Sequence, residues 1–272
     1  MIWRMGNRYA AGGGRSQGLA IDYKERDKMP GRIDLRRANV MVRLFSVSIC
    51  LLLLALANPA YTQSKNRAPG FEALPRGSTI VIMPTDIELF EISAGGVLEP
   101  KAEWTATAAK HFRDVLDTKR KLLDLNSAFL SEKDADDVAE INTLHAAVAR
   151  AISMHHFGAS SFYLPTKNEK LDWSLGESVQ VIKQKTGANY AFFSWIRDSY
   201  ASAGRVGSMI VLALLGVGVS GGVQVGYASL VDLNTGQVLW FNQLTRASGD
   251  LRSAEKAQET LESLLKDFPA VK

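Results

Sequence analysis

The only cysteine of this 272-residue chain, Cys50, lies inside an uncharged, apolar run from Leu44 to Ala57. A lone cysteine cannot form an intramolecular disulfide, so the fold has to depend on the burial of apolar side chains. The residues that follow the run are numerous enough to build such a core. We therefore expect a globular domain that is stabilised by its hydrophobic core alone.

The apolar run has the organisation of a secretory signal peptide over residues 41–62. A basic start at residues 41–43 precedes it, and small residues suited to cleavage follow between positions 57 and 63. The run is too short for a hydrocarbon core of about 30 Å, which needs about 20 residues. We expect a periplasmic or secreted protein. Lipid anchoring is not expected, because Ile49 precedes Cys50 and four leucines follow it.

The net charge of +4 comes from the residues before the apolar run. Residues 1–43 carry ten basic and four acidic side chains, a net +6, whereas the remainder carries 22 basic and 24 acidic side chains, a net −2. The segment 1–40 is rich in Gly and Arg and lacks apolar periodicity, which predicts disorder. We interpret Met41 as the initiator and residues 1–40 as an over-extended start. A cytoplasmic basic arm before an uncleaved signal anchor is the alternative.

The charge distribution also bears on partners. The domain after the signal peptide is net acidic, and its densest basic cluster is only Lys119-Arg120-Lys121. Nucleic-acid binding needs an extended basic surface that neutralises several phosphates. We therefore expect no nucleic-acid partner.

Residues 63–78 resemble a linker, and residues 79–272 a single α/β domain with a helical insert at 101–157. Strands are expected at 79–83, 87–92, 97–98, 190–197, 226–233 and 237–244, with hairpins at Gly95-Gly96 and Asn234-Thr235-Gly236. Helices are expected from Lys101, from Asp134 to Gly158, from Ser174 to Thr186, and after a cap at Ser248 or Asp250. The pattern predicts an α/β (α+β) fold: a mixed sheet of about four to six strands packed by three to four helices, with a C-terminal β-hairpin followed by a terminal helix.

The segment 206–225 is apolar and uncharged but is broken by Gly216, Gly218, Gly221 and Gly222. Its central part, 209–215, is long enough for one or two buried helical turns. Two interpretations remain open. The segment packs in the core or an interface, or it inserts into a membrane or a multimeric pore.

Two motifs in this segment imitate catalytic or cofactor signatures. Residues 216–221 fit the dinucleotide fingerprint G-x-G-x-x-G, and residues 218–222 fit the nucleophile elbow G-x-S-x-G. Both need a helix immediately afterwards, whereas the sequence here predicts a strand. The elbow also needs a histidine after the serine, and the last histidine is His156. We expect neither dinucleotide binding nor catalysis by a nucleophilic serine.

No metal site is expected either. The four histidines are His111, His145, His155 and His156, and none forms an i,i+4 pair with another. Two of them lie near apolar helical stripes, where packing explains them. Asp134, Asp136 and Asp137 lack the glycine and the terminal glutamate of a calcium loop. We expect no catalytic residue and no cofactor, and the sequence identifies no small-molecule substrate.

The stretch Gly226–Trp240 contains the pattern V-D-x-x-T-G between two apolar strands, the second of which carries a tryptophan. Residues 80–84 (IVIMP) and 186–190 (TGANY) precede it in order. Together these pieces resemble bacterial envelope proteins related to the TolB N-terminal domain and the curli secretion lipoprotein CsgG. The resemblance implies a cell-envelope protein that binds proteins and assembles without catalysis. This chain departs from those families in having no lipobox cysteine, no following propeller and its own insert at 101–157.

We expect a non-catalytic structural or interaction protein that binds a protein partner or itself, with peripheral membrane contact as a further option. The alternatives are a membrane-inserting assembly component that uses residues 206–225 and an exported hydrolase with an unrecognised site. The predicted interaction residues are Met209, Leu212, Leu215, Gly218, Gly221, Asn234 and Trp240.

Overall fold

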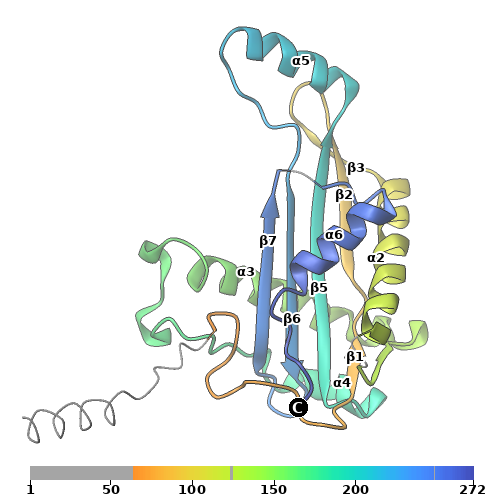
Figure 1. Cartoon of the computed structure of the whole chain (residues 1–272), viewed down its shortest axis with the longest axis vertical. Helices are drawn as coiled ribbons and strands as arrows, with labels where there is room; N and C mark the ends of the chain where they lie inside the picture. The colour runs from red at the N-terminus through yellow and green to blue at the C-terminus, as the bar shows by residue number, and fades with distance from the viewer. Residues whose placement is uncertain (1–63, 123–124, 248) are drawn as a thin grey trace, which may run out of the picture. The chain divides into compact units, whose positions relative to one another are not determined.

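Strand β5 (Tyr190–Ala201) lies at the centre of a mixed sheet (Figure 1). The computed structural model describes residues 64–122, 125–247 and 249–272, and these belong to one compact unit. Over this part of the chain the sheet has seven strands, one more than the upper end of the expected range, and the α/β class is confirmed. The other strands are β1 (Ile80–Ile82), β2 (Asp86–Ile92), β3 (Leu98–Pro100), β4 (Ser127–Phe129), β6 (Gln224–Asp232) and β7 (Val238–Arg246).

The length of β5 lets it pair with three strands. On one side it runs antiparallel to β6, from Tyr190 opposite Asp232 to Asp198 opposite Gln224, and β7 continues the sheet beyond β6. On the other side its first residues pair in parallel with β1 and its later residues in parallel with β2. Strand β4 lies outside β1 in parallel, and β3 lies outside β2 in antiparallel orientation. The chain therefore leaves the sheet between β1 and β2 and returns to it.

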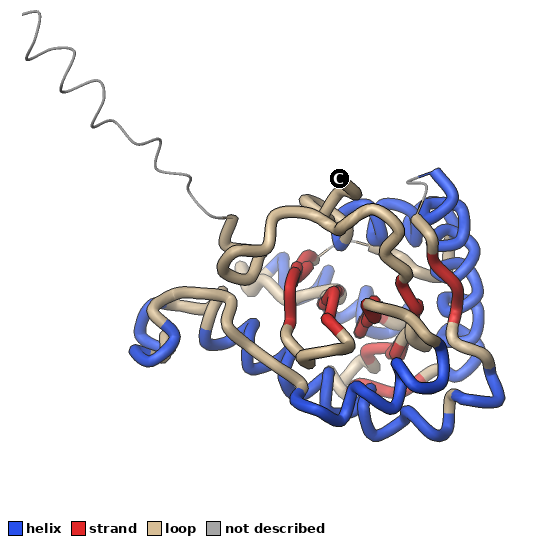
Figure 2. Tube along the Cα trace, turned by 90° about the horizontal axis from the view of Figure 1, so that it is seen from below, coloured by secondary structure: helices blue, strands red, loops and turns tan. Residues whose placement is uncertain are grey.

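Alternate residues of β5 pack into two separate cores, because successive side chains of a strand point to opposite faces. Phe192 and Ile196 pack with α2 (Ala102–Leu122) and α6 (Ala254–Leu264). Phe193 packs on the other face with α3 (Ala139–His155) and α4 (Gln180–Thr186). Figure 2 shows the strands enclosed between these helical segments. A fifth helix, α5 (Ala203–Leu214), belongs to neither core.

Two predicted helix starts are wrong. Asp134 does not cap α3, because residues 132–134 and 136–138 form short 3₁₀ turns before the helix begins at Ala139. Helix α6 is capped by Ser253, whose Oγ accepts from the Lys256 N–H at 3.3 Å. Asp250 instead binds Arg252, and Ser248 lies outside the described residues.

Two segments pack more closely than their sequence suggests. In the stretch expected to be a linker, Ala68 and Leu74 are fully buried, and the Ala68 N–H donates to the Leu239 carbonyl at 2.9 Å. The expected insert 101–157 contributes β4 to the sheet as well as two helices. The expected leader and signal peptide, residues 1–62, lie outside the described residues.

The turn between β6 and β7 requires glycine at position 236. Gly236 has φ +74°, a left-handed conformation, and a Cβ there would lie 2.2 Å from the carbonyl oxygen of Gly176. The two backbones are held together by a hydrogen bond of 2.9 Å from the Leu175 N–H to the Gly236 carbonyl. The hairpin predicted at this glycine is confirmed.

We expect Gly236→Ala to lower the free energy of unfolding by more than the about 1–2 kcal/mol that a left-handed conformation costs a non-glycine residue. Gly77→Ala is the matched control, because Gly77 has φ +77° and open space around it. Urea unfolding of both variants separates the clash from the conformational cost. Equal losses in the two variants would contradict the close approach to Gly176.

Candidate interaction surface and its surroundings

Along the chain, helix α5 follows β5 and precedes β6, and these two strands are neighbours in the sheet (Figure 1). Ser202 begins it, because its Oγ accepts from the Arg205 N–H at 3.1 Å. Gly216 follows its end with φ +77°, which suits a helix C-terminus. Figure 1 shows α5 beyond the ends of β5 and β6, away from the helices that cover the sheet.

Large apolar side chains on the outer side of α5 face solvent. No residue of this helix is buried, and Ile210 and Leu214 are 59% and 83% exposed, as is Leu215 directly after it at 72%. The chain carries no charged residue from 206 to 231. A helix that is apolar on most of its surface is normally buried, so exposure of this kind indicates a contact surface. We name the exposed side chains of this segment the apolar helix surface: Val206, Ile210, Val211, Leu214, Leu215 and Val217.

Two glycines let α5 lie close to its neighbours, and a third glycine lies close to β5. A Cβ on Gly204 would lie 3.3 Å from the Ala94 Cβ, and one on Gly221 would lie 3.1 Å from the Met209 Cε. Gly222 approaches the Ser199 carbonyl so closely that a Cβ would lie 2.0 Å from its oxygen. Of the glycines that imitated a cofactor loop, Gly221 and Gly222 therefore serve close packing, whereas a Cβ on Gly216 or Gly218 would meet nothing within 4 Å. Strand β6 follows them, as expected.

The structure places five of the seven predicted interaction residues together on and after α5. Leu215 and Gly218 are exposed, whereas Met209, Leu212 and Gly221 are half-buried on the inner side. The expectation of buried helical turns at 209–215 is wrong, since the helix is exposed along its outer side. Apolar periodicity alone could not show that the helix is exposed, because an apolar helix has the same sequence pattern in a core and in an interface.

The other two predicted residues lie elsewhere. Asn234 is exposed in the β6–β7 turn, at the opposite end of β6 from α5, where it binds Lys183 and Asp232. Trp240 is fully buried, with its ring 5.1 Å from that of Phe268 in an edge-on contact. It is a core residue and presents no surface to a partner.

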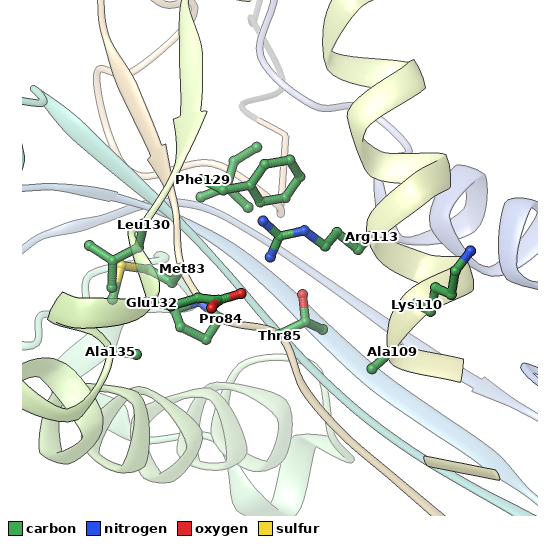
Figure 3. A pocket seen from close by; sticks show the side chains of 11 residues that line it. Met83, Pro84, Thr85, Ala109, Lys110, Arg113, Phe129, Leu130, Glu132 and Ala135 are labelled. Carbon is green, nitrogen blue, oxygen red and sulfur yellow. The ribbon is translucent and has the colours of Figure 1, made fainter. Parts of the chain in front are cut away.

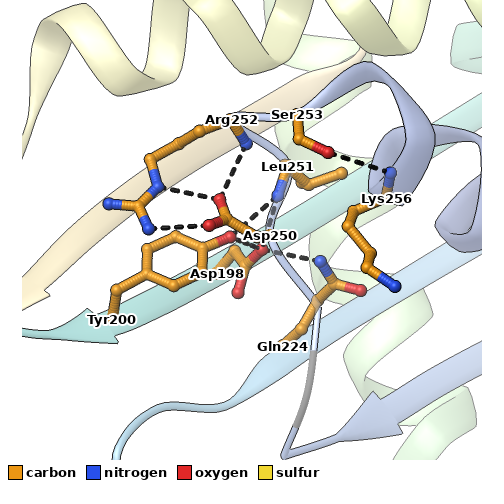
Figure 4. Close-up of polar contacts among 8 residues, drawn as sticks. All are labelled: Asp198, Tyr200, Gln224, Asp250, Leu251, Arg252, Ser253 and Lys256. Atoms are coloured by element: carbon orange, nitrogen blue, oxygen red, sulfur yellow. Dashed lines mark hydrogen bonds and ion pairs between the residues drawn. The ribbon is translucent and has the colours of Figure 1, made fainter.

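A buried polar cluster joins the strands that carry α5 to the start of α6 (Figure 4). Asp198 is 2% exposed, and its Oδ2 accepts from Gln224 Nε2 at 2.6 Å and from the Tyr200 hydroxyl. The Tyr200 oxygen in turn accepts from the Leu251 N–H at 2.8 Å. Burial raises the pKa of Asp198 and, together with that carboxylate, raises the pKa of Tyr200.

Arg252 packs against one side of this cluster. It forms an ion pair of 2.7 Å with Asp250, and its guanidinium carbon lies 4.1 Å from the centre of the Tyr200 ring. Because β5, β6 and the loop before α6 all contribute, the cluster fixes the strand ends on which α5 stands (Figure 4). We assign it a structural role.

His145 forms a second buried polar contact. Its Nε2 lies 2.8 Å from the Ser229 Oγ, and its ring stacks on Phe193 at 4.5 Å. Burial lowers the pKa of His145 to about 3, so the imidazole is neutral. Both residues are buried in the core, out of reach of a substrate, so the pair resembles a nucleophile and base only in composition. The expectation of an ordinary packed histidine agrees with this position.

The described residues contain no cluster of three or more His, Cys, Asp or Glu side chains that could hold a metal ion. Of the helices in the described part of the chain, none combines the length and the apolar character of a membrane span.

Comparison with known proteins gives weak similarities. No family model and no curated protein matches the chain, so the resemblance to the TolB N-terminal domain and CsgG finds no match there. Among solved structures, a variant PelC dodecamer from Paraburkholderia phytofirmans is 13% identical, with a TM-score of 0.36 over 75% of this chain and 96% of that chain.

Two further solved structures have lower TM-scores. The LpoB C-terminal domain from Salmonella enterica is 13% identical, with a TM-score of 0.27 over 66% of this chain and 87% of that chain. Lipoprotein GNA1162 from Neisseria meningitidis is 10% identical, with a TM-score of 0.28 over 70% of this chain and 94% of that chain. At this level of similarity, function has to be argued from the residues of the chain itself.

Proposed function

We propose that this chain is a non-catalytic interaction protein of the bacterial cell envelope, exported to the periplasm, which associates with a protein partner or with further copies of itself. The observation that carries the proposal is the apolar helix surface, an uncharged helix whose large aliphatic side chains face solvent. Exposed patches of this kind in a globular protein mark interaction sites. The signal-peptide pattern of residues 41–62 supports export.

The physical basis of association is burial of these side chains. Covering an aliphatic side chain of this size contributes about 1.5–3 kcal/mol, and each 1.4 kcal/mol changes affinity about tenfold. The Ser202 cap and the close contacts of Gly204 and Gly221 hold α5 on the strand ends, which reduces the entropy that a partner would have to offset. The surface is therefore suited to an assembly that does not depend on charge.

We expect the double substitution Ile210→Glu and Leu214→Lys to weaken association about a hundredfold. Glutamate four residues before lysine is the favourable helical orientation, so the helix itself should persist. Size-exclusion chromatography with light scattering on the protein from residue 63 onward measures the effect, together with pull-down of the bound partner. Phe162→Glu is the matched control, because Phe162 is an exposed apolar residue on a different element.

Unchanged assembly and unchanged partner capture in the double variant would contradict the proposal, as would an equal loss in the Phe162 variant. The same side chains would also suit contact with a lipid surface. Flotation with phospholipid vesicles separates that outcome, since a protein that binds vesicles but neither itself nor a protein partner would favour the membrane alternative.

A further inference from the structure

A cavity of about 410 Å³ lies where the sheet is interrupted between β1 and β2 (Figure 3). Strand β1 pairs with β5 up to Ile82 opposite Phe192, and β2 begins at Asp86 opposite Trp195. Three residues, 83–85, therefore face only two on β5. Pro84 cannot donate to a ladder, so the chain leaves the sheet here.

The cavity lies at the carboxyl ends of two parallel strands, β1 and β4, between α2 and residues 130–135. Helix α2 precedes β4 and packs on one face of the sheet, whereas α3 follows β4 and packs on the other. In open α/β sheets, ligands bind at this kind of crevice, where the chain changes from one face to the other. The volume falls within the usual range for small-molecule sites, about 300–1,000 Å³.

The cavity combines apolar walls with a few polar groups. Figure 3 shows the Arg113 guanidinium, the Thr85 hydroxyl and the Glu132 carboxylate around it. Arg113 stacks on Phe129, with its guanidinium carbon 4.3 Å from the ring centre. Thr85 Oγ1 accepts from the Ser194 hydroxyl at 3.0 Å, which leaves its own proton free to donate. The apolar walls come from Ile82, Met83, Pro84, Ala109, Leu130 and Ala135.

Two of the three charged side chains that line the cavity are exposed to solvent and are not paired with a neighbour in the described part of the chain. Lys110 forms an ion pair of 2.9 Å with Asp114. Within the described ranges, by contrast, neither Arg113 nor Glu132 has an ion-pair partner. A planar guanidinium that is already oriented by an aromatic ring suits a carboxylate, and a free carboxylate suits an ammonium group.

We propose that this cavity binds a small zwitterion of the amino-acid class with an aliphatic side chain. Its carboxylate pairs with Arg113 and accepts from the Thr85 hydroxyl, and its ammonium group pairs with Glu132. Its aliphatic part contacts the apolar wall at Met83 and Phe129. This site is independent of the apolar helix surface and of the function proposed for it.

The test uses three probes that differ by one charged group: L-leucine, 4-methylpentanoate, which lacks the ammonium group, and 3-methylbutylamine, which lacks the carboxylate. Titration calorimetry on the protein from residue 63 onward is expected to show saturable 1:1 binding of L-leucine. Each of the other two probes should bind at least tenfold more weakly. Arg113→Gln and Glu132→Gln should each weaken L-leucine binding at least tenfold.

Arg150→Gln and Glu140→Gln are the matched controls, because these residues are exposed on α3 and are not among those that line the cavity. Both controls should leave the affinity unchanged. No saturable binding of L-leucine would overturn the proposal. Binding of 4-methylpentanoate as tight as that of L-leucine would overturn the role of Glu132, and unchanged affinity in Arg113→Gln would overturn the site. Far-ultraviolet circular dichroism of each variant verifies that it is folded.

Discussion

His145→Gln should make the protein less sensitive to acid. The pKa of His145 is lowered to about 3 by burial, from an ordinary value of 6.5, so the folded state keeps it neutral while the unfolded state takes up a proton below pH 6.5. The stabilisation that comes from a neutral His145 is therefore complete above pH 6.5 and is lost as the pH falls from 6.5 towards 3. Each pH unit in that window lowers the unfolding free energy by about 1.4 kcal/mol.

At pH 4.5 the wild type should have lost about 3 kcal/mol through this residue alone, and the glutamine variant none of it. Urea unfolding at pH 8 and at pH 4.5 measures the difference. The value at pH 8 is the control, because His145 is neutral in both states there and only the cost of the altered side chain remains. Burial also lowers the pKa of His156, so the variant keeps a smaller acid dependence in the same direction. Parallel curves for the two proteins would contradict this account.

Trp240→Ala should lower the unfolding free energy by about 3–5 kcal/mol, the usual cost of removing a large aromatic side chain from a core. Trp240 is fully buried and meets Phe268 edge-on, in the core that also contains Leu230 and Leu261. Thermal and urea unfolding measure the loss. We expect the variant that remains folded to assemble like the wild type, since the side chain presents no surface.

Trp240→Phe serves as the comparison for this site. Its ring keeps much of the packing, and the substitution removes an indole N–H that is buried without an acceptor among the described residues. The loss of stability should therefore be clearly smaller than for alanine. If the Trp240→Ala variant kept its stability but lost assembly, Trp240 would belong to the interaction surface, as its sequence context predicted.

Local patterns predicted most of the elements because their signals are local. Apolar runs bounded by Pro84 or by glycine gave β1 and both hairpins, and spacing of three and four residues gave α2 and α6. Strand β4 was not predicted, because its three residues are too few to show alternation and it is held by its parallel pairing with β1. Ser253 was missed as a cap because Asp250, nearby in the sequence, has the same preference for that position.

The candidate sites were less accessible to sequence reasoning. The segment 206–225 was singled out, but whether α5 faces a core or solvent depends on where the strands before and after it end. Arg113 and Glu132 carry no motif. They share a cavity only because the chain leaves the sheet at Pro84 and α2 packs beside the gap. The fold of the chain brings these residues together, so their spacing in the sequence gives no indication of the site.

The pairing of Asp198 with Gln224 has a consequence for how this protein can change. Beyond that pair β5 continues to Ala201, whose N–H donates to the Gly221 carbonyl at 2.8 Å, so the segment that contains α5 leaves and returns at neighbouring points and a tight turn could join the two strands there. Closing a longer loop at such a point costs little additional free energy, because the entropic cost rises by only about 0.6 kcal/mol for each doubling of the loop length. Binding preference could therefore diversify, in evolution or by engineering, through exchange of this one segment while the sheet and both cores stay the same.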